Sequence, residues 1–141
     1  MNFHDYCGSG RILVVDDHAP TRELLSLRLG VIGYHVQTTD NGARAMERIY
    51  SFSPDAVICD LDMPELDGFG VLERLGPERL AHLPVMMLTA SHKAADVRRA
   101  IELGARDYLA KPFDEHQLFR RVARLLRKRP ANAAAALRRA A

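Results

Sequence analysis

The chain has 141 residues, 48% of them hydrophobic, with 9 Gly and 7 Pro, which predicts one globular domain with a buried core and excludes extensive disorder. No apolar run approaches the roughly 18 residues needed to cross a bilayer, and residues 1–10 lack the pattern of a signal peptide. We therefore expect a cytoplasmic protein without a membrane partner. Its two cysteines are too few for a disulfide framework and are expected to be reduced thiols.

The net charge of +2 conceals an asymmetry between the body and the C-terminal end. Residues 120–141 hold eight basic and no acidic side chains, so the remainder carries 12 basic against 18 acidic ones. Pro130 interrupts the helical pattern before an alanine-rich stretch. We expect residues 1–10 to form a flexible arm and residues 129–141 a basic tail, either the start of a linker to an output domain or the end of a stand-alone protein.

Between these ends, short apolar strands alternate with longer helical patterns. The strands are expected near residues 11–15, 33–38, 55–59, 84–89 and 106–110, and the helices near residues 20–30, 42–51, 66–75, 93–103 and 114–128. Pro20, Asn41 and Gly104 agree with these helix boundaries. Strands that are each followed by a helix imply right-handed crossovers, which predicts an α/β fold with five β/α pairs and a parallel sheet covered on both faces.

The last two helices carry apolar side chains at helical spacing. Residues expected to face the core are Val97, Ile101, Leu118, Phe119, Val122, Leu125 and Leu126. Residues expected to face partners are Arg98, Arg99, Arg120 and Arg121.

Polar side chains follow four of the predicted strands. Asp16 and Asp17 come after the first strand and Asp60 after the third, whereas Thr89 and Lys111 end or follow the fourth and fifth. In an open parallel sheet, ligands bind at the carboxyl ends of the strands where strand order reverses. The sequence therefore predicts one site of three carboxylates, a hydroxyl and an ammonium.

These groups suit phosphoryl transfer to a carboxylate. With an ordinary pKa near 4, Asp60 would already be ionised and would need no catalytic base. Three close carboxylates repel one another, so a cation is needed, and Mg²⁺ suits a site of few carboxylates plus waters and phosphate oxygens. The Lys111 ammonium and the Thr89 hydroxyl can each take one oxygen of the transferred group.

The motifs at these positions resemble those of response-regulator receiver domains of two-component signalling. They are Asp16-Asp17, the segment from Asp60 to Gly68 (DLDMPELDG), Thr89-Ala90, and the segment from Asp107 to Phe113 (DYLAKPF). The resemblance covers about residues 10–128, and we take residues 11–128 as the receiver domain. It implies the chemotaxis-regulator-like, doubly wound fold with flavodoxin-like strand order 2-1-3-4-5, and a protein that is not an enzyme beyond its own phosphorylation and dephosphorylation.

For the site, the resemblance implies that Asp60 accepts phosphate from a sensor histidine kinase or a histidine phosphotransfer protein. Asp17, Asp60 and the backbone carbonyl of Asp62 would bind Mg²⁺, with Asp16 acting through water. Lys111 would be the counter-ion of the phosphate, and its bond to the following proline is expected to be cis.

For regulation, the resemblance implies that Thr89 and Tyr108 form a switch pair. Asp62 and Ser91 would flank the path of the water that hydrolyses the phosphate. The face formed by the fourth helix, fifth strand and fifth helix would then change for output docking or homodimerisation.

Each residue alone also has an ordinary structural interpretation. Asp16 and Asp17 could cap a helix, Thr89 could be a strand-end hydroxyl, Lys111 a solvated lysine and Tyr108 a core aromatic. Only their combination in this order predicts a site.

Two other functions fit part of the sequence. Asp60-Leu-Asp62 also resembles the Asp-x-Asp of Mg²⁺-dependent haloacid-dehalogenase-type phosphatases, but it follows the third strand and precedes Met-Pro, and the chain has no room for a cap domain. A binding module could use the basic tail to grip nucleic acid or an acidic partner. Without a helix-turn-helix or aromatic platform, direct nucleic-acid binding is not expected for this chain.

Overall fold

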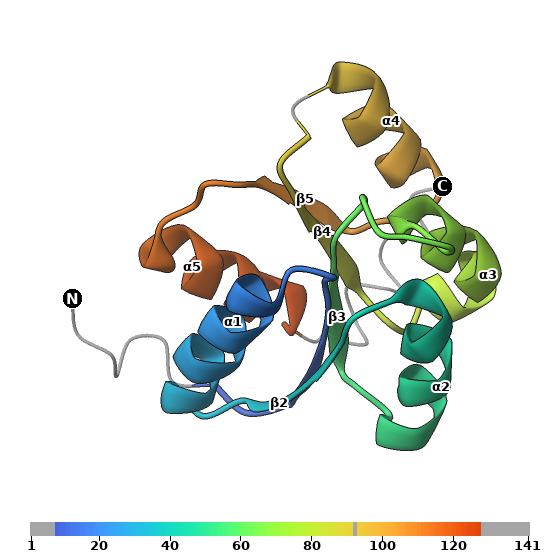
Figure 1. Ribbon diagram of the computed structural model, residues 1–141. Coiled ribbons are helices and arrows are strands. Elements are labelled where there is room, and N and C mark those ends of the chain that lie inside the picture. Colours follow the sequence, from blue (N-terminus) through green and yellow to red (C-terminus); the bar gives the residue numbers. More distant parts are fainter. Residues whose placement is uncertain (1–7, 92, 128–141) are drawn as a thin grey trace, which may run out of the picture.

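The computed structural model describes residues 8–91 and 93–127, and within them strands and helices alternate strictly (Figure 1). The strands are β1 (Arg11–Val15), β2 (His35–Thr39), β3 (Ala56–Cys59), β4 (Val85–Thr89) and β5 (Asp107–Ala110). The helices are α1 (Ala19–Val31), α2 (Gly42–Phe52), α3 (Gly68–Leu80), α4 (Ala94–Glu102) and α5 (Glu115–Leu125). The predicted α/β alternation is confirmed.

The strands form one sheet in the order β2-β1-β3-β4-β5, and all pairs are parallel. This confirms the expected doubly wound, flavodoxin-like topology. The strand order reverses between β1 and β3, where Leu13 of β1 lies opposite Gln37 of β2 on one side and Val57 of β3 on the other. The topology therefore places the ligand-binding crevice beyond the carboxyl ends of β1 and β3.

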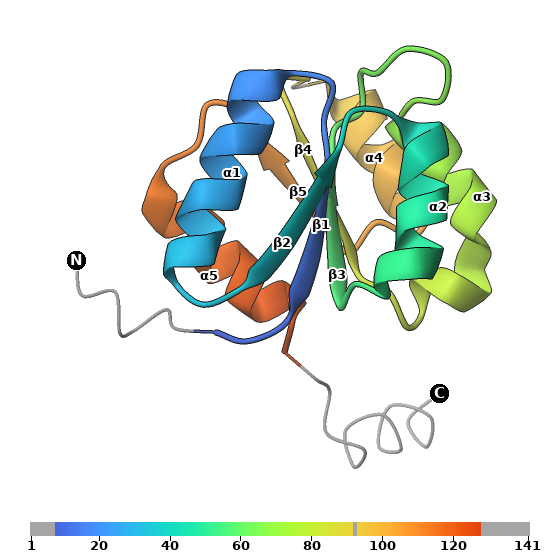
Figure 2. The same ribbon diagram turned by 60° about the horizontal axis from the view of Figure 1, so that its bottom comes forward.

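Two hydrophobic cores lie on opposite faces of the sheet, because successive strand side chains point to opposite faces. Helices α1 and α5 cover one face, and α2, α3 and α4 cover the other (Figures 1 and 2). In β1, Ile12 and Val14 join the core under α1 and α5, whereas Leu13 and Val15 join the core under α2 and α3. The central strands are thus buried on both sides, which fixes their ends in space.

Several element boundaries differ from the expectation, including the start of helix α3, which lies at Gly68 rather than near residue 66. Strand β2 begins at His35 rather than near residue 33. Helix α3 continues beyond residue 75 to Leu80, but Gly76 within it adopts a left-handed φ of 73° before Pro77 starts a short second piece. The predicted end at residue 75 therefore marks a kink, where glycine tolerates a conformation that costs other residues more. Helix α5 ends at Leu125 rather than near residue 128.

The expected core positions of α5 are confirmed, but one of those in α4 is wrong. Leu118, Phe119, Val122 and Leu125 are buried, and Leu126 is half-buried. In α4, Ile101 is 49% exposed, and the helix turns Ala100 toward the core instead. Successive residues of a helix are rotated by about 100° around its axis. Because Ala100 faces the core, Ile101 is turned away from it.

The expected basic tail, residues 129–141, and most of the expected N-terminal arm lie outside the described residues. Of the arm, Gly8 donates its backbone N–H to the carbonyl of Ile32 at 3.1 Å, and the carbonyl of Gly10 accepts from His35 at 2.9 Å. Among the described residues, no helix is long and apolar enough to cross a bilayer.

Candidate phosphoacceptor site

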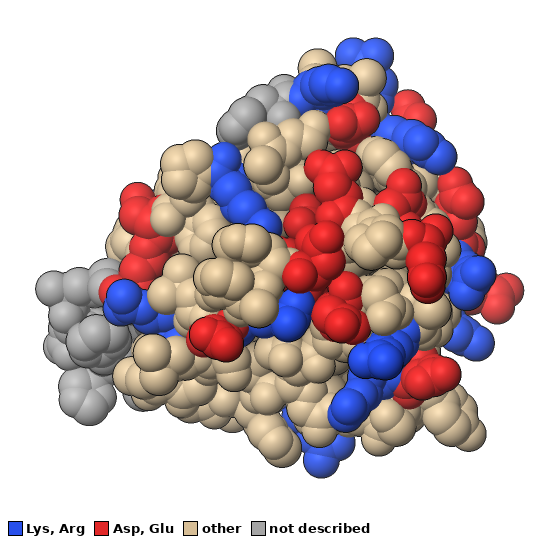
Figure 3. Space-filling view, viewed as in Figure 1, with Lys and Arg blue, Asp and Glu red and all other residues tan. Residues whose placement is uncertain are grey.

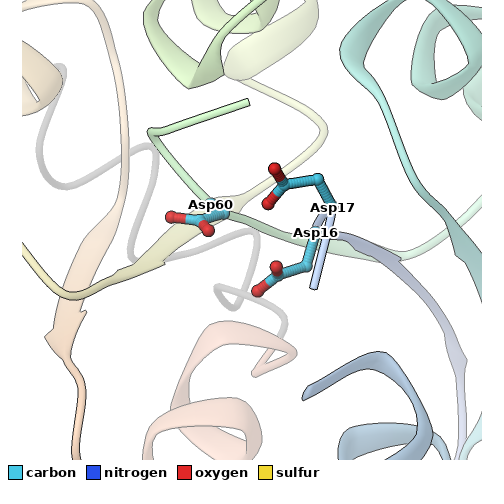
Figure 4. Close-up of side chains that lie close together, drawn as sticks. All are labelled: Asp16, Asp17 and Asp60. Carbon is cyan, nitrogen blue, oxygen red and sulfur yellow. The ribbon is translucent and has the colours of Figure 1, made fainter. Parts of the chain in front are cut away.

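The ends of β1 and β3 bring three carboxylates together (Figure 4). One oxygen of each of Asp16, Asp17 and Asp60 lies within 4.8 Å of the others, and the carboxylates of Asp16 and Asp17 extend toward that of Asp60. Asp16 and Asp60 are buried, at 2% and 7% exposed, whereas Asp17 is exposed. The predicted convergence of these three residues is confirmed. On the surface, acidic side chains gather in a band across the middle of this face (Figure 3).

Asp16 is held in one orientation by its neighbours. Its Oδ1 accepts the backbone N–H of His18 at 2.9 Å, and its Oδ2 accepts from Lys111 Nζ at 2.8 Å. Its backbone is also fixed, because its N–H donates to the carbonyl of Thr39 at 3.1 Å and its carbonyl accepts from Arg22 Nη1 at 2.7 Å. Asp16 thus combines a paired buried charge with a rigid main chain.

Lys111 comes from the loop after β5 and points back over the carboxylates. Its Nζ lies 2.8 Å from Asp16 Oδ2 and 3.6 Å from Asp60 Oδ2, with the side chain 21% exposed. The expected cis peptide bond between Lys111 and Pro112 is confirmed. By these distances, the ammonium lies beside carboxylate oxygens of both Asp16 and Asp60.

Asp60 differs from the expectation in its ionisation. Its pKa is raised above the ordinary value, first because burial penalises the charged carboxylate and second because the negative charge of Asp16 is close. The Lys111 ammonium, a hydrogen bond with Thr89 and the backbone N–H of Asp62 act in the opposite direction. Assuming an ordinary pKa was therefore wrong, because the sequence alone does not show how deeply this carboxylate is buried.

Thr89, Ser91 and Tyr108 are linked through the loop between β4 and α4. The Thr89 side chain is fully buried, and its Oγ1 accepts the backbone N–H of Ser91 at 3.3 Å. The Tyr108 hydroxyl donates to the carbonyl of Ser91 at 3.0 Å. The Ser91 hydroxyl in turn donates to Asp96 Oδ2, in the first turn of α4, at 2.6 Å. A chain of hydrogen bonds therefore runs from the site to α4.

The donor set suits a hard divalent cation. Mg²⁺ prefers oxygen ligands and binds through one or two carboxylates plus waters and phosphate oxygens. Asp16, Asp17 and Asp60 supply three convergent carboxylates. Because Asp17 is exposed, the cluster is open to solvent on its side. Asp62 is exposed and contacts the cluster through its backbone N–H, which lies 3.4 Å from Asp60 Oδ1. The residues present therefore fit a magnesium site.

The sequence interpretation missed residues that support the site from neighbouring elements. Arg22 fixes the carbonyl of Asp16, and Asp96 fixes Ser91. Away from the site, at the start of β5, Asp107 pairs with Arg121 at 2.6 Å and Arg124 at 3.1 Å on α5. No motif marks these partners, because the contacts depend on how the helices pack against the sheet.

Comparison with known proteins agrees with this geometry. Residues 12–123 match the family model described as the response regulator receiver domain. The chain belongs to this family. The family match favours a receiver over a haloacid-dehalogenase-type phosphatase for the Asp60-centred site.

Among curated relatives, a probable transcriptional regulator, ycf27 of Guillardia theta, is 41% identical over 118 residues, which is 84% of this chain and 46% of that protein. The DNA-binding dual master transcriptional regulator RpaA of Synechocystis sp. is 40% identical over 119 residues, covering 84% and 49%. A solved structure of a putative response regulator from Chloroflexus aurantiacus is 37% identical with a TM-score of 0.77, covering 84% of this chain and 98% of that one. The receiver thus spans about half the length of the curated relatives it matches.

Proposed function

We propose that Asp60 of this receiver domain is phosphorylated by a phosphohistidine on a sensor histidine kinase or a histidine phosphotransfer protein. One observation carries the proposal, namely that the Asp60 carboxylate lies between two further carboxylates and the Lys111 ammonium. A bond would form between an Asp60 oxygen and phosphorus as the phosphorus–nitrogen bond of the donor breaks. The ionised carboxylate acts as the nucleophile, and the positive charges of Lys111 and Mg²⁺ would favour this ionised form against the raised pKa of Asp60.

The surrounding residues have distinct roles in this proposal. Asp16, Asp17, Asp60 and the backbone carbonyl of Asp62 would hold Mg²⁺, whose charge would offset the carboxylates and the incoming phosphoryl oxygens. Asp16 holds Lys111 at 2.8 Å, which keeps the ammonium within reach of a phosphoryl oxygen on Asp60. Thr89 would donate its hydroxyl to another oxygen of that group.

Intact-mass spectrometry after incubation with acetyl phosphate tests the assignment. The wild-type chain is expected to gain one phosphate with Mg²⁺ present and none with EDTA. Asp60→Asn is expected to gain none, and the matched control Asp62→Asn, two residues away, is expected to remain phosphorylated. A phosphate retained by Asp60→Asn would contradict the assignment.

We further propose that Thr89 and Tyr108 transmit the phosphorylated state to the face formed by α4, β5 and α5. The hydrogen bonds from Thr89 through Ser91 to Tyr108 and Asp96 support this route. A hydrogen bond from Thr89 to a phosphoryl oxygen would stabilise one arrangement by on the order of 1.5–3 kcal/mol, enough to bias a two-state surface. The exposed Ile101 and the Arg–Asp107 pairs make this face suitable for an output domain or a second copy of the chain.

Amide exchange with beryllofluoride and Mg²⁺ tests the switch. Protection of α4 and β5 is expected to change in the wild-type chain and in the control Thr38→Ala, which alters a threonine one residue before the end of β2. In Thr89→Ala the change is expected to shrink to the loops around Asp60. An undiminished change in Thr89→Ala would contradict this coupling.

The output that we propose is control of transcription, because the matched relatives carry the names of transcriptional regulators. DNA binding is proposed for a region outside residues 12–123, the segment that matches the receiver family.

A further inference from the structure

A hollow of about 210 Å³ lies at the open edge of the sheet, and none of the three phosphoacceptor carboxylates is among the residues that line it. Strand β2 forms this edge between α1 and α2 (Figure 2). The residues lining the hollow are Arg22 of α1, Thr38 and Thr39 of β2, Asp40 of the following loop, and Arg44 and Arg48 of α2. Three arginines from two helices therefore surround one small space.

The positive charge of this hollow is only partly neutralised. Its lining contains three guanidinium groups and one carboxylate. Arg44 Nη1 lies 3.6 Å from Asp40 Oδ1, a long and exposed ion pair, and Arg48 Nη1 donates to the neutral Gln37 at 3.1 Å. Each guanidinium has five N–H donors, so most of these donors remain available to a ligand. The three guanidinium groups and one carboxylate of the lining leave a net charge of +2, which an anion of charge −2 would neutralise.

We propose that this hollow binds a small dianionic oxyanion, of which inorganic phosphate is the simplest member. Guanidinium groups form paired hydrogen bonds with phosphate oxygens, and several arginines around one anion strengthen binding. The half-buried Thr38, which also lines the hollow, adds a neutral hydroxyl donor. The small volume selects a compact anion rather than a nucleotide.

The same hollow is connected to the phosphoacceptor site through Asp16. The backbone N–H of Asp16 donates to the carbonyl of Thr39, and its carbonyl accepts from Arg22 Nη1. Both of these partners line the hollow. An anion that draws the Arg22 guanidinium outward would weaken its bond to Asp16, so binding at the edge is expected to alter the loop that carries Asp16 and Asp17.

The test is a titration of the ¹⁵N-labelled full chain with sodium phosphate, followed by amide chemical shifts. Sodium chloride keeps the ionic strength constant and EDTA removes divalent metal, so the result is independent of Asp60 phosphorylation. We expect saturable shifts at Thr38, Thr39 and Arg48. The Asp16 amide is expected to follow the same curve, and a curve that differs would overturn the coupling.

The variants separate a site from general charge. Arg44→Gln combined with Arg48→Gln is expected to raise the apparent dissociation constant by roughly tenfold or more, as loss of charge-assisted hydrogen bonds implies. The matched pair Arg98→Gln with Arg120→Gln, two exposed arginines of α4 and α5, is expected to change it by less than about twofold. Asp40→Asn removes the opposing charge and is expected to tighten binding.

Three results would overturn the proposal. The first is equal shifts in the wild-type chain and the Arg44, Arg48 double variant. The second is the same shifts on adding sodium chloride alone. The third is a response that begins at Thr89, Ala90 and Lys111, because it would place phosphate in the phosphoacceptor site.

Discussion

Helices α4 and α5 flank the same strand, β5, but they are attached to the body very differently. Helix α5 buries Leu118, Phe119, Val122 and Leu125, and the paired hydrogen bonds between Asp114 and Gln117 close its first turn. Helix α4 buries only Ala100 among its residues, and its N-cap residue makes no side-chain cap bond. Elements with little buried apolar surface open at low cost, so α4 is the part of this face best suited to move.

The contacts that do hold α4 lie mostly at the surface. Arg99 stacks over the ring of Phe69 at 4.3 Å and lies 3.4 Å from Glu73 of α3. Exposed ion pairs and exposed cation–π contacts each contribute about 1 kcal/mol or less. In the face formed by α4, β5 and α5, helix α5 is therefore anchored by buried packing. Helix α4 is held by weaker contacts, which a hydrogen bond to a charged group, worth about 1.5–3 kcal/mol, can outweigh.

The largest expected effect is the loss of the α5 anchor. Phe119→Ala should lower the free energy of unfolding by about 3–5 kcal/mol, because it removes a buried ring and leaves a cavity. Val97→Ala, on the half-buried side of α4, should cost about 1 kcal/mol or less. Urea unfolding followed by circular dichroism measures both. Equal losses would show that α4 and α5 are equally anchored.

A second prediction concerns Asp60, the buried carboxyl group at the end of β3. Because the pKa of Asp60 is raised, the folded protein binds this proton more tightly than the unfolded chain does. Stability from this carboxyl is greatest below its ordinary pKa of about 3.9 and falls as pH rises through the raised value. In EDTA, Asp60→Asn should therefore be more stable than wild type near neutral pH.

The pH dependence provides the control for this second prediction. The advantage of Asp60→Asn should shrink as the pH falls toward about 4, because a raised pKa lets the folded wild-type carboxyl take up its proton before its ordinary pKa is reached. Thermal unfolding at several pH values measures the difference. A constant advantage at all pH values would attribute the effect to packing rather than charge, and a less stable variant at neutral pH would contradict the raised pKa.

A third prediction concerns Ile101, the exposed apolar side chain of α4. If the face is used for homodimerisation, Ile101→Asp should abolish the dimer formed with beryllofluoride and Mg²⁺, because a charge replaces a half-exposed apolar contact. Leu27→Asp is the matched control, since Leu27 of α1 is 65% exposed on the other side of the sheet. Sedimentation velocity measures both variants. A dimer lost only in Leu27→Asp would move the interface to α1.

The contrast between the two helices also shows what the sequence could predict. The site was predictable because parallel strands end at one edge, so Asp16, Asp60 and Thr89 had to lie near one another once the strands were recognised. The core face of α5 was predictable because a long amphipathic pattern fixes the rotation of a helix.

The rotation of α4 was not predictable in the same way. Five of its nine residues are apolar, but three of these are alanines that mark no clear core face, and packing against α3 and β5 decided that Ala100 rather than Ile101 points inward. The raised pKa of Asp60 and the arginine hollow were missed for a related reason. Burial depth and the meeting of Arg22 with Arg44 and Arg48 are properties of the packed fold, and no local spacing in the chain encodes them.

The smallest expected effect concerns the lifetime of the phosphate on Asp60. It depends on which neighbouring side chain is attached to helix α4 and which is not. The Ser91 hydroxyl is held by Asp96 of α4, whereas the side chain of Asp62 is exposed beside the acceptor and is free to orient or repel water. Asp62→Ala should therefore change the dephosphorylation rate by roughly threefold, equivalent to less than about 1 kcal/mol in the barrier, with little change in the extent of phosphorylation.

Decay of the phosphorylated mass after removal of acetyl phosphate measures this rate, and Ser91→Ala, in the loop after β4, is the matched comparison. Because Ser91 is tied to the loosely attached helix, its substitution should change both the lifetime and the exchange of α4, whereas Asp62→Ala should change the lifetime alone. An unchanged rate in Asp62→Ala would remove this side chain from the hydrolytic step. A change of α4 exchange in Asp62→Ala would instead show that α4 senses the acceptor by a route that bypasses Ser91.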